Sequence, residues 1–381
     1  MTPTRRDFVR AALAAPFLSS GLWAQDSGRP AFPGLIVRAH EPRNLEFPVS
    51  ELRDPIIPNE HFFVRSHFAV PQVDVKSWRL KVEGAVERPF ELSYEDLTSL
   101  TSRTLTATLE CAGNGRVHLA PPVPGLQWGQ GAVGNADWAG VPLAAILDKA
   151  GLKNSAVEVI LEGADTGQIN ADPKSPGPIH FARSLPVEKA KRDEVLLAYK
   201  MNGETLPESH GHPVRAVVGG WYGMASVKWL TRIVVSDQPF RGFFQTLDYS
   251  YFERKGGLPT LRPVTAVQPK AILARPGLNE IIPADKPFRL FGAAWAGERA
   301  VDKVEVSVDG GKTWTAAKLL GEAKPVQWVF WEHVWDRPAR GNASIVARAT
   351  DDQGHTQPPA RDPDRRTYMI NHLVPVPVTV R

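Results

Sequence analysis

The pattern of hydrophobic and polar positions changes near residue 261. Beyond this point Val304, Val306 and Val308 alternate with polar residues, and an Asp309-Gly310-Gly311 turn precedes a return strand that should begin at Thr313-Trp314. Further alternating or apolar runs have the length and spacing of short strands: 288–295, 326–335, 344–349 and 374–380. The pattern predicts an all-β sandwich of the immunoglobulin type over residues 261–381.

The pattern between residues 61 and 260 is mixed. Ser93 offers a capping hydroxyl with the carboxylate of Asp96 three residues later, so a short helix should begin there. Residues 141–150 have helical spacing and end at Gly151, a suitable C-cap. Short β-rich runs lie between long irregular loops: 157–161, 214–218 and 227–235. We therefore expect an α+β domain in which loops carry the functional site.

The N-terminal segment has the features of an export signal. Arg5 and Arg6 are followed by Phe8, a modestly apolar stretch and the small residue Ala24. This arrangement predicts a twin-arginine signal peptide over residues 1–24 and a periplasmic protein that folds, with its cofactor, before export. The stretch is too short for a stable membrane span, and no later span is expected. Residues 25–60 are Pro-rich and should form an extended arm.

Composition narrows the possible functions only slightly. The 381 residues suffice for two domains, and 34 prolines with 31 glycines favour strands and loops over a helical bundle. The formal net charge is +4, and basic and acidic residues are interspersed. No nucleic-acid partner is therefore expected.

Cys111 is the only cysteine of the chain. It lies in the run Thr108-Leu109-Glu110-Cys111-Ala112-Gly113-Asn114-Gly115-Arg116, so it cannot form an intrachain disulfide. A buried free cysteine and a metal ligand are both compatible with such a thiol. One cysteine cannot hold an iron–sulfur cluster, and no Cys-x-x-Cys-His motif attaches a haem.

Four ordered motifs resemble the molybdopterin-binding domain of the sulfite oxidase family. They are Phe63-Val64-Arg65-Ser66-His67, the run around Cys111, His210-Gly211-His212-Pro213-Val214-Arg215, and Ser226-Val227-Lys228-Trp229-Leu230. The turn at residues 309–314 resembles the C-terminal dimerisation domain of that family, and the resemblance covers about residues 40–372. It implies a mixed α/β-loop catalytic domain followed by an immunoglobulin-like dimerisation domain.

The resemblance implies a role for individual residues. Cys111 would ligate molybdenum, because molybdenum takes soft sulfur donors. Arg65 and Arg116 would bind the substrate oxyanion, which planar guanidinium groups do with paired hydrogen bonds. Tyr249 matches the active-site tyrosine of the family, with Tyr251 as the rival assignment. The residues implied to hold molybdopterin and its metal are Phe63, Arg65, His67, Cys111, Asp165, His210, Arg215, Ser226 and Lys228.

One part of the family pattern is missing. Members often add a third substrate-facing arginine from an aromatic stretch of the second domain, and the apparent counterpart, residues 328–335, contains none. His333, Arg337 or Arg340 could replace it. The resemblance implies oxidation of sulfite to sulfate, a separate c-type cytochrome as electron acceptor, and a homodimer. The alternatives are a related sulfur-compound dehydrogenase, a sulfoxide reductase of the superfamily, and a cofactor-free periplasmic binding protein.

The segment Gly129-Gln130-Gly131-Ala132-Val133-Gly134 has the spacing of a dinucleotide-binding loop. It follows a Pro-rich loop rather than a strand, and Gly140 and Pro142 interrupt the helix that should follow. We therefore do not expect a nucleotide site there.

Overall fold

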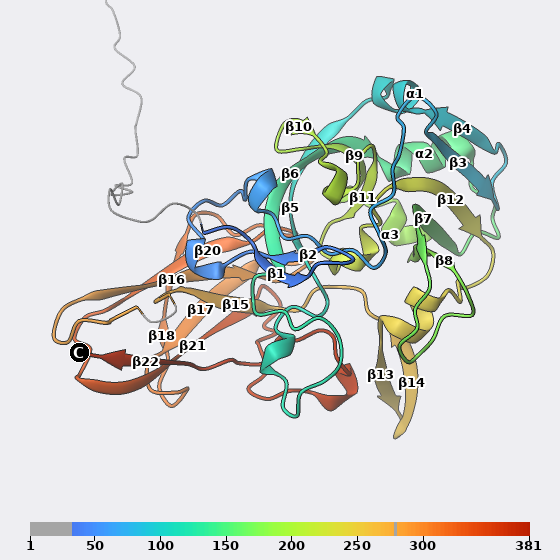
Figure 1. Ribbon diagram of the computed structural model, residues 1–381. Coiled ribbons are helices and arrows are strands. Elements are labelled where there is room, and N and C mark those ends of the chain that lie inside the picture. The colour runs from blue at the N-terminus through green and yellow to red at the C-terminus, as the bar shows by residue number, and fades with distance from the viewer. Residues whose placement is uncertain (1–32, 278–279) are drawn as a thin grey trace, which may run out of the picture. The chain divides into compact units, whose positions relative to one another are not determined.

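The computed structural model describes residues 33–277 and 280–381 (Figure 1). The expected export signal, residues 1–24, lies outside the described residues and stays a prediction. The described elements belong to one unit, Gly34–Arg381.

The segment expected to be an extended arm contains regular structure. Strands β1 (Ile36–Ala39) and β2 (Asn44–Glu46) form an antiparallel hairpin, followed by the 3-10 turns Val49–Glu51 and Asn59–His61. The backbone N–H groups of Leu45 and Val64 donate to each other's carbonyl oxygens at 2.9 Å. The hairpin thereby fixes the backbone beside Arg65.

One sheet of the N-terminal part has the antiparallel order β10-β9-β6-β5, with β11 also paired to β9. Its strands are β5 (Arg103–Glu110), β6 (Val133–Pro142), β9 (Val195–Met201), β10 (Glu204–Thr205) and β11 (Arg215–Val218). Strand β5 ends at Glu110, directly before Cys111, and β11 begins at Arg215. Two of the predicted site residues thus stand at strand ends.

A second sheet has the order β4-β3-β12-β7-β8, in which only the β12–β3 pair is parallel among the described strands. Its strands are β3 (Arg79–Gly84), β4 (Phe90–Ser93), β7 (Glu158–Gly167), β8 (Ile179–Pro186) and β12 (Leu230–Ser236). Strand β7 carries Asp165, and β12 follows the segment that contains Lys228.

The helices of this part are short. The capping box predicted at Ser93 is confirmed: its Oγ accepts from the Asp96 N–H at 3.1 Å, and helix α1 (Tyr94–Ser99) follows. Helix α2 (Leu143–Ala150) ends at Gly151 as expected but begins two residues later than the spacing suggests, because Val141 and Pro142 pair with strand β9. A third helix, α3, spans Val187–Ala190.

The hairpin of β13 (Ser250–Lys255) and β14 (Leu258–Pro263) connects the two parts of the chain. Residue 260, the predicted end of the catalytic domain, lies inside β14. The domain boundaries predicted at residues 60 and 260 stay predictions.

The C-terminal part is a β sandwich with sheets of order β15-β16-β20-β19 and β18-β17-β21-β22. The strands are β15 (Lys270–Arg275), β16 (Phe288–Trp295), β17 (Val301–Ser307), β18 (Thr315–Ala316), β19 (Lys318–Leu320), β20 (Val329–Trp335), β21 (Gly341–Asp351) and β22 (Val376–Val380). Leu290 and Trp331 of one sheet and Val304 and Ile345 of the other share a buried core. The predicted fold class is confirmed.

The turn at Asp309 differs slightly from the prediction. The Asp309 carboxylate accepts from the backbone N–H groups of Lys312 and Thr313 at 3.0 and 2.9 Å, which keeps these residues in the turn. The return strand therefore begins at Thr315 rather than Thr313. Among the helices of the described residues, none is long and apolar enough to cross a membrane.

Candidate active site

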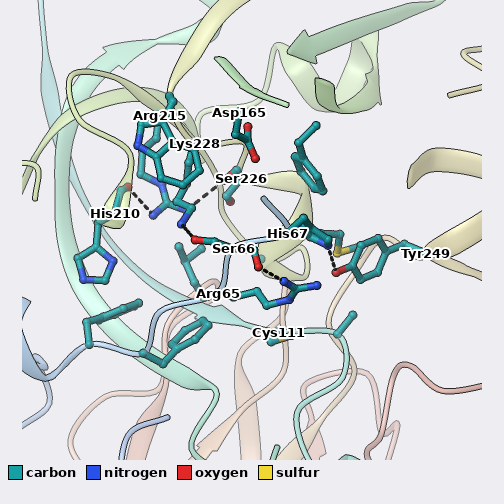
Figure 2. A pocket seen from close by; sticks show the side chains of 18 residues that line it. Arg65, Ser66, His67, Cys111, Asp165, His210, Arg215, Ser226, Lys228 and Tyr249 are labelled. Atoms are coloured by element: carbon teal, nitrogen blue, oxygen red, sulfur yellow. Dashed lines mark hydrogen bonds between the residues drawn. The ribbon is translucent and has the colours of Figure 1, made fainter. Parts of the chain in front are cut away.

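A cavity brings together all the residues predicted to hold a cofactor (Figure 2). They come from five places in the sequence, and they are Phe63, Arg65, His67, Cys111, Asp165, His210, Arg215, Ser226 and Lys228. The cavity wall also contains residues to which the sequence analysis gave no role: Ser66 and Trp229 from the motifs, and Phe181 and Met224 from outside them. Only the folded chain assembles this set, because most of its members are distant in sequence.

Cys111 stands at the start of a tight loop, residues 111–116, which we call the Cys111 loop. The Cys111 N–H donates to the Ala132 carbonyl at 2.9 Å, and the Asn114 N–H donates back to the Cys111 carbonyl at 2.8 Å. Gly115 has a φ of 98°, a conformation that other residues adopt at a cost. The side chain of Cys111 is buried beside the cavity, where a thiolate can serve as a soft metal donor.

Arginine and lysine side chains of the described residues line the cavity at three positions: Arg65, Arg215 and Lys228. Arg215 donates to the carbonyls of His210 and Ser226 at 2.9 and 3.0 Å, and burial lowers its pKa to about 9. The Nζ of Lys228 donates to Ser66 Oγ at 3.0 Å, and burial together with Arg215 lowers its pKa well below the ordinary value. Cations that are costly to bury and close together favour an anionic ligand.

Among the described residues, Asp165 is the one carboxylate that lines the cavity. Its Oδ1 atom is buried and has no hydrogen-bond partner within the described chain. Burial raises its pKa to about 6, although nearby Lys228 acts in the opposite direction. A buried oxygen without a donor is costly, so this position favours a ligand that carries N–H groups.

His67 and Tyr249 form a hydrogen-bonded pair, with 2.7 Å between Nε2 and the phenolic oxygen (Figure 2). The His67 ring stacks on Phe181 at a centroid distance of 4.5 Å. Burial, followed by Arg65 and Lys228, holds the pKa of His67 well below its usual value, and burial raises the pKa of Tyr249 above its usual value. Both groups are therefore neutral near pH 7.

Tyr249 follows a π-helical turn, Phe244–Asp248, whose position depends on Arg183. Arg183 is completely buried and donates to the carbonyls of Phe244 and Val264, the latter at 2.7 Å. The Val264 N–H in turn donates to the Tyr249 carbonyl at 2.9 Å. A single buried arginine thus holds the backbone on both sides of Tyr249, and no motif in the sequence indicated this role.

The structure separates two alternatives left open by the sequence. Tyr249 lines the cavity. Tyr251 instead lies beneath the guanidinium of Arg365, whose Cζ is 4.7 Å from the centroid of the Tyr251 ring.

Arg116 is not among the described residues that line the cavity. It is buried and donates to the carbonyls of Leu126 and Thr367 at 2.7 and 3.2 Å.

The second part of the chain reaches the site through residues 366–369 rather than through residues 328–335. The Tyr368 ring lies 4.7 Å from that of Tyr249, and its hydroxyl donates to Asp248 at 2.5 Å. Arg366 donates to the carbonyls of Leu247 and Ser250 at 3.0 and 3.2 Å. The candidates for the missing arginine do not belong to the described cavity lining; they are His333, Arg337 and Arg340.

The glycine-rich segment at residues 129–134 has an internal role. The N–H groups of Gly129 and Gly131 each donate to the carboxylate of Glu46 at 2.9 Å. A side chain at Gly131 would also collide with the Phe47 carbonyl oxygen.

Within the described residues, no group of three or more His, Cys, Asp or Glu side chains could hold a metal ion.

Comparisons with known proteins agree with this geometry. The family described as the oxidoreductase molybdopterin binding domain matches residues 67–244, and the Mo-co oxidoreductase dimerisation domain matches residues 262–379. Sulfite oxidase of Gallus gallus is 37% identical over 348 residues, which are 86% of this chain and 74% of that protein. Mitochondrial sulfite oxidase of Mus musculus is 36% identical, and the match covers 86% of this chain but 62% of that protein.

A solved structure resembles the fold over nearly its whole length. The sulfane dehydrogenase SoxCD from Paracoccus pantotrophus superposes with a TM-score of 0.81 and 28% identity, covering 96% of this chain and 95% of that chain. The chain belongs to the sulfite oxidase family of molybdenum oxidoreductases, whose cofactor is molybdenum bound to molybdopterin.

Proposed function

We propose that the protein oxidises sulfite to sulfate and passes the electrons to a separate c-type cytochrome. The reaction adds one oxygen atom from water to sulfite and releases two protons and two electrons. The observation that carries the proposal is that Cys111 and Arg65 line one cavity together with Arg215 and Lys228. This set combines a soft metal donor with the positive charge that an oxyanion substrate requires.

The cavity residues fit the family cofactor. Cys111 would donate its sulfur to molybdenum, and Arg215, Ser226 and Lys228 would hold the phosphate of molybdopterin. The unpartnered Oδ1 of Asp165 would accept from an N–H group of the pterin. When bound, the cofactor supplies the two-electron redox chemistry and the transfer of oxygen, while the protein supplies binding and electrostatics.

The chain's own groups orient the substrate and handle protons. Arg65 would bind two sulfite oxygens through its guanidinium and thereby direct the sulfur towards the metal. The neutral Tyr249 hydroxyl has one hydrogen, which it can give either to His67 or to an oxygen in the cavity. A proton released in the cavity could pass through this hydroxyl to Nε2 of His67, and the buried imidazolium that forms beside Arg65 would readily release it again. Arg116 was predicted to bind the substrate directly, but its bond to the Thr367 carbonyl supports an indirect role through the Cys111 loop.

A second candidate is oxidation of another reduced sulfur compound. It is favoured by the full-length similarity to the structure described as a sulfane dehydrogenase. It is also compatible with the position of residues 328–335 outside the described cavity lining. A larger sulfur substrate would depend less on a third arginine than an oxyanion does. Family membership argues against the cofactor-free binding protein considered from the sequence.

We also propose a cellular location, an oligomeric state and an electron acceptor for the protein. The paired arginines at positions 5 and 6 support export to the periplasm by the twin-arginine pathway. The match of residues 262–379 to a dimerisation domain supports a homodimer. A c-type cytochrome is the proposed acceptor because the chain lacks a haem attachment motif.

A turnover assay tests the proposal. Protein from a host competent in molybdopterin synthesis should reduce a c-type cytochrome in the presence of sulfite, with much lower rates for thiosulfate. A preference for thiosulfate would favour the second candidate. Oxidation of a reduced dye by an organic sulfoxide, without any sulfite-dependent rate, would contradict both.

A further inference from the structure

The Cys111 loop is held from the second part of the chain by a buried ion pair. Lys270, the first residue of β15, donates from Nζ to Glu110 Oε1 at 2.9 Å. The side chains of Lys270 and Glu110 are only 5% and 2% exposed. Glu110 directly precedes Cys111, so this pair acts on the backbone beside the thiol.

The pair belongs to a small network in which each polar atom of Glu110 has a partner. Glu110 Oε1 also accepts from Asn114 Nδ2 at 3.1 Å, and Oε2 accepts from Trp295 Nε1 at 2.9 Å. Lys270 and Trp295 face each other across the β15–β16 ladder. One cross-strand pair of the sandwich therefore supplies two of the three side-chain donors to this carboxylate.

The same network reaches the far side of the Cys111 loop. Lys270 Nζ donates to the Asn114 carbonyl at 3.0 Å, and Asn114 closes the turn onto Cys111. The Met369 N–H, also from the second part, donates to the Ala112 carbonyl at 2.8 Å. The residues before and after Cys111 are thus both bonded to the C-terminal part of the chain.

We propose that Lys270 and Glu110 are positioning residues that fix the direction of the Cys111 thiol for metal binding. Removing one partner of a buried ion pair is strongly destabilising, and replacing both by neutral residues often is not. This difference allows a loss of stability to be separated from a loss of positioning. The part of this proposal that concerns metal binding rests on the proposed function, in which Cys111 ligates molybdenum. The part that concerns the orientation of the thiol does not depend on that function.

The reactivity of Cys111 in cofactor-free protein provides the test, because the chain has no other cysteine. Lys270→Met removes the donor to both Glu110 and Asn114. We expect the thiol to react with a small disulfide reagent about tenfold faster or more than in the wild type, since the loop loses hydrogen bonds to a charged group. After cofactor loading, the variant should also retain less molybdenum per chain.

Lys189→Met is the matched control. Lys189 is a comparably buried lysine whose Nζ donates to Glu298 at 2.6 Å and Glu194 at 2.8 Å, so it also links the two parts of the chain. Its third hydrogen bond goes to the Gly219 carbonyl, so none of the three involves the Cys111 loop. Each protein is measured at the same number of degrees below its own melting temperature. Under this condition the thiol of the Lys189→Met variant should react as fast as that of the wild type. Equal acceleration in both variants would overturn the proposal.

The double variant Glu110→Gln/Lys270→Met keeps the test decisive if the single variant does not fold. It removes both charges and should regain most of the melting temperature, but the Asn114 carbonyl still lacks its donor. We expect the thiol to stay more reactive than in the wild type. Recovery of stability together with full thiol protection would overturn the proposal. Absence of molybdenum from wild-type protein would instead contradict the proposed function and leave the thiol comparison valid.

Discussion

The Nε2 atom of His67 lies 2.7 Å from the phenolic oxygen of Tyr249, although the two residues are 182 positions apart. Phe181 and Phe244 pack against the His67 ring at centroid distances of 4.5 and 4.8 Å. Aromatic packing on one side and the hydrogen bond on the other leave the imidazole little freedom. The pair therefore presents a neutral proton donor and acceptor at a fixed place in the cavity.

Tyr249→Phe tests the proton-handling role of this pair. The variant keeps the ring but loses the hydroxyl, so kcat with sulfite should fall by about tenfold or more while the molybdenum content stays normal. Tyr251→Phe is the matched control, since Tyr251 packs under Arg365 rather than in the cavity. Equal kcat values for the two variants would exclude Tyr249 from the chemical step.

Arg65→Gln tests substrate binding. Loss of a charge-assisted contact to an anion should raise the KM for sulfite by about tenfold or more, with near-normal molybdenum. Arg53→Gln serves as a control, because Arg53 pairs with Glu51 on the surface. An unchanged KM in a metal-loaded Arg65 variant would show that this guanidinium does not contact the substrate.

Cys111→Ala tests the metal ligand. Because the soft sulfur donor is lost, we expect the protein to contain little molybdenum and to show no sulfite oxidation. Metal analysis of the purified protein measures this directly, and the melting temperature of the cofactor-free form checks that the fold is intact. Stoichiometric molybdenum with full activity would contradict the assignment.

His210 predicts a pH dependence of stability. Burial, with Lys228 and Arg215, lowers its pKa to about 3 in the folded state, whereas the unfolded chain has the ordinary value near 6.5. Between these values the unfolded state binds the extra proton, so stability falls as the pH decreases through this range. The loss attributable to His210 approaches about 1.4 kcal/mol per pH unit.

The variant His210→Gln isolates this effect, because glutamine can still donate to the Asn59 carbonyl that His210 contacts at 3.2 Å. Denaturant unfolding of the cofactor-free protein between pH 7 and pH 4 should show a shallower loss of stability in the variant. Parallel curves would mean that His210 is not held neutral.

The oligomeric state is a separate prediction. Light scattering at micromolar concentration should give twice the mass of the mature chain, because residues 262–379 match a dimerisation domain and closed two-fold pairs are the commonest homo-oligomers. A monomer at that concentration would contradict the homodimer.

Local sequence determined the features that depend on neighbouring residues. The capping box at Ser93 and Asp96 and the strand Phe288–Trp295 both lie where the pattern predicts them. Each of the four ordered motifs contributes at least one residue to the cavity wall, among them Arg65, Cys111, Arg215 and Lys228, although only the folded chain brings the motifs together. The capping box needs only contacts between residues three positions apart.

The tertiary structure alone decided which side chains meet. Tyr249 and Tyr251 are rival assignments in the sequence, and the fold places Tyr249 in the cavity wall and Tyr251 under the guanidinium of Arg365. Similarly, residues 328–335 resembled the substrate-facing stretch, yet Tyr368 approaches Tyr249 instead. Lys270 and Glu110 are 160 positions apart, and neither carries a local signal of the other. Such pairings arise because burial requires each polar group to find a partner wherever the fold brings one close.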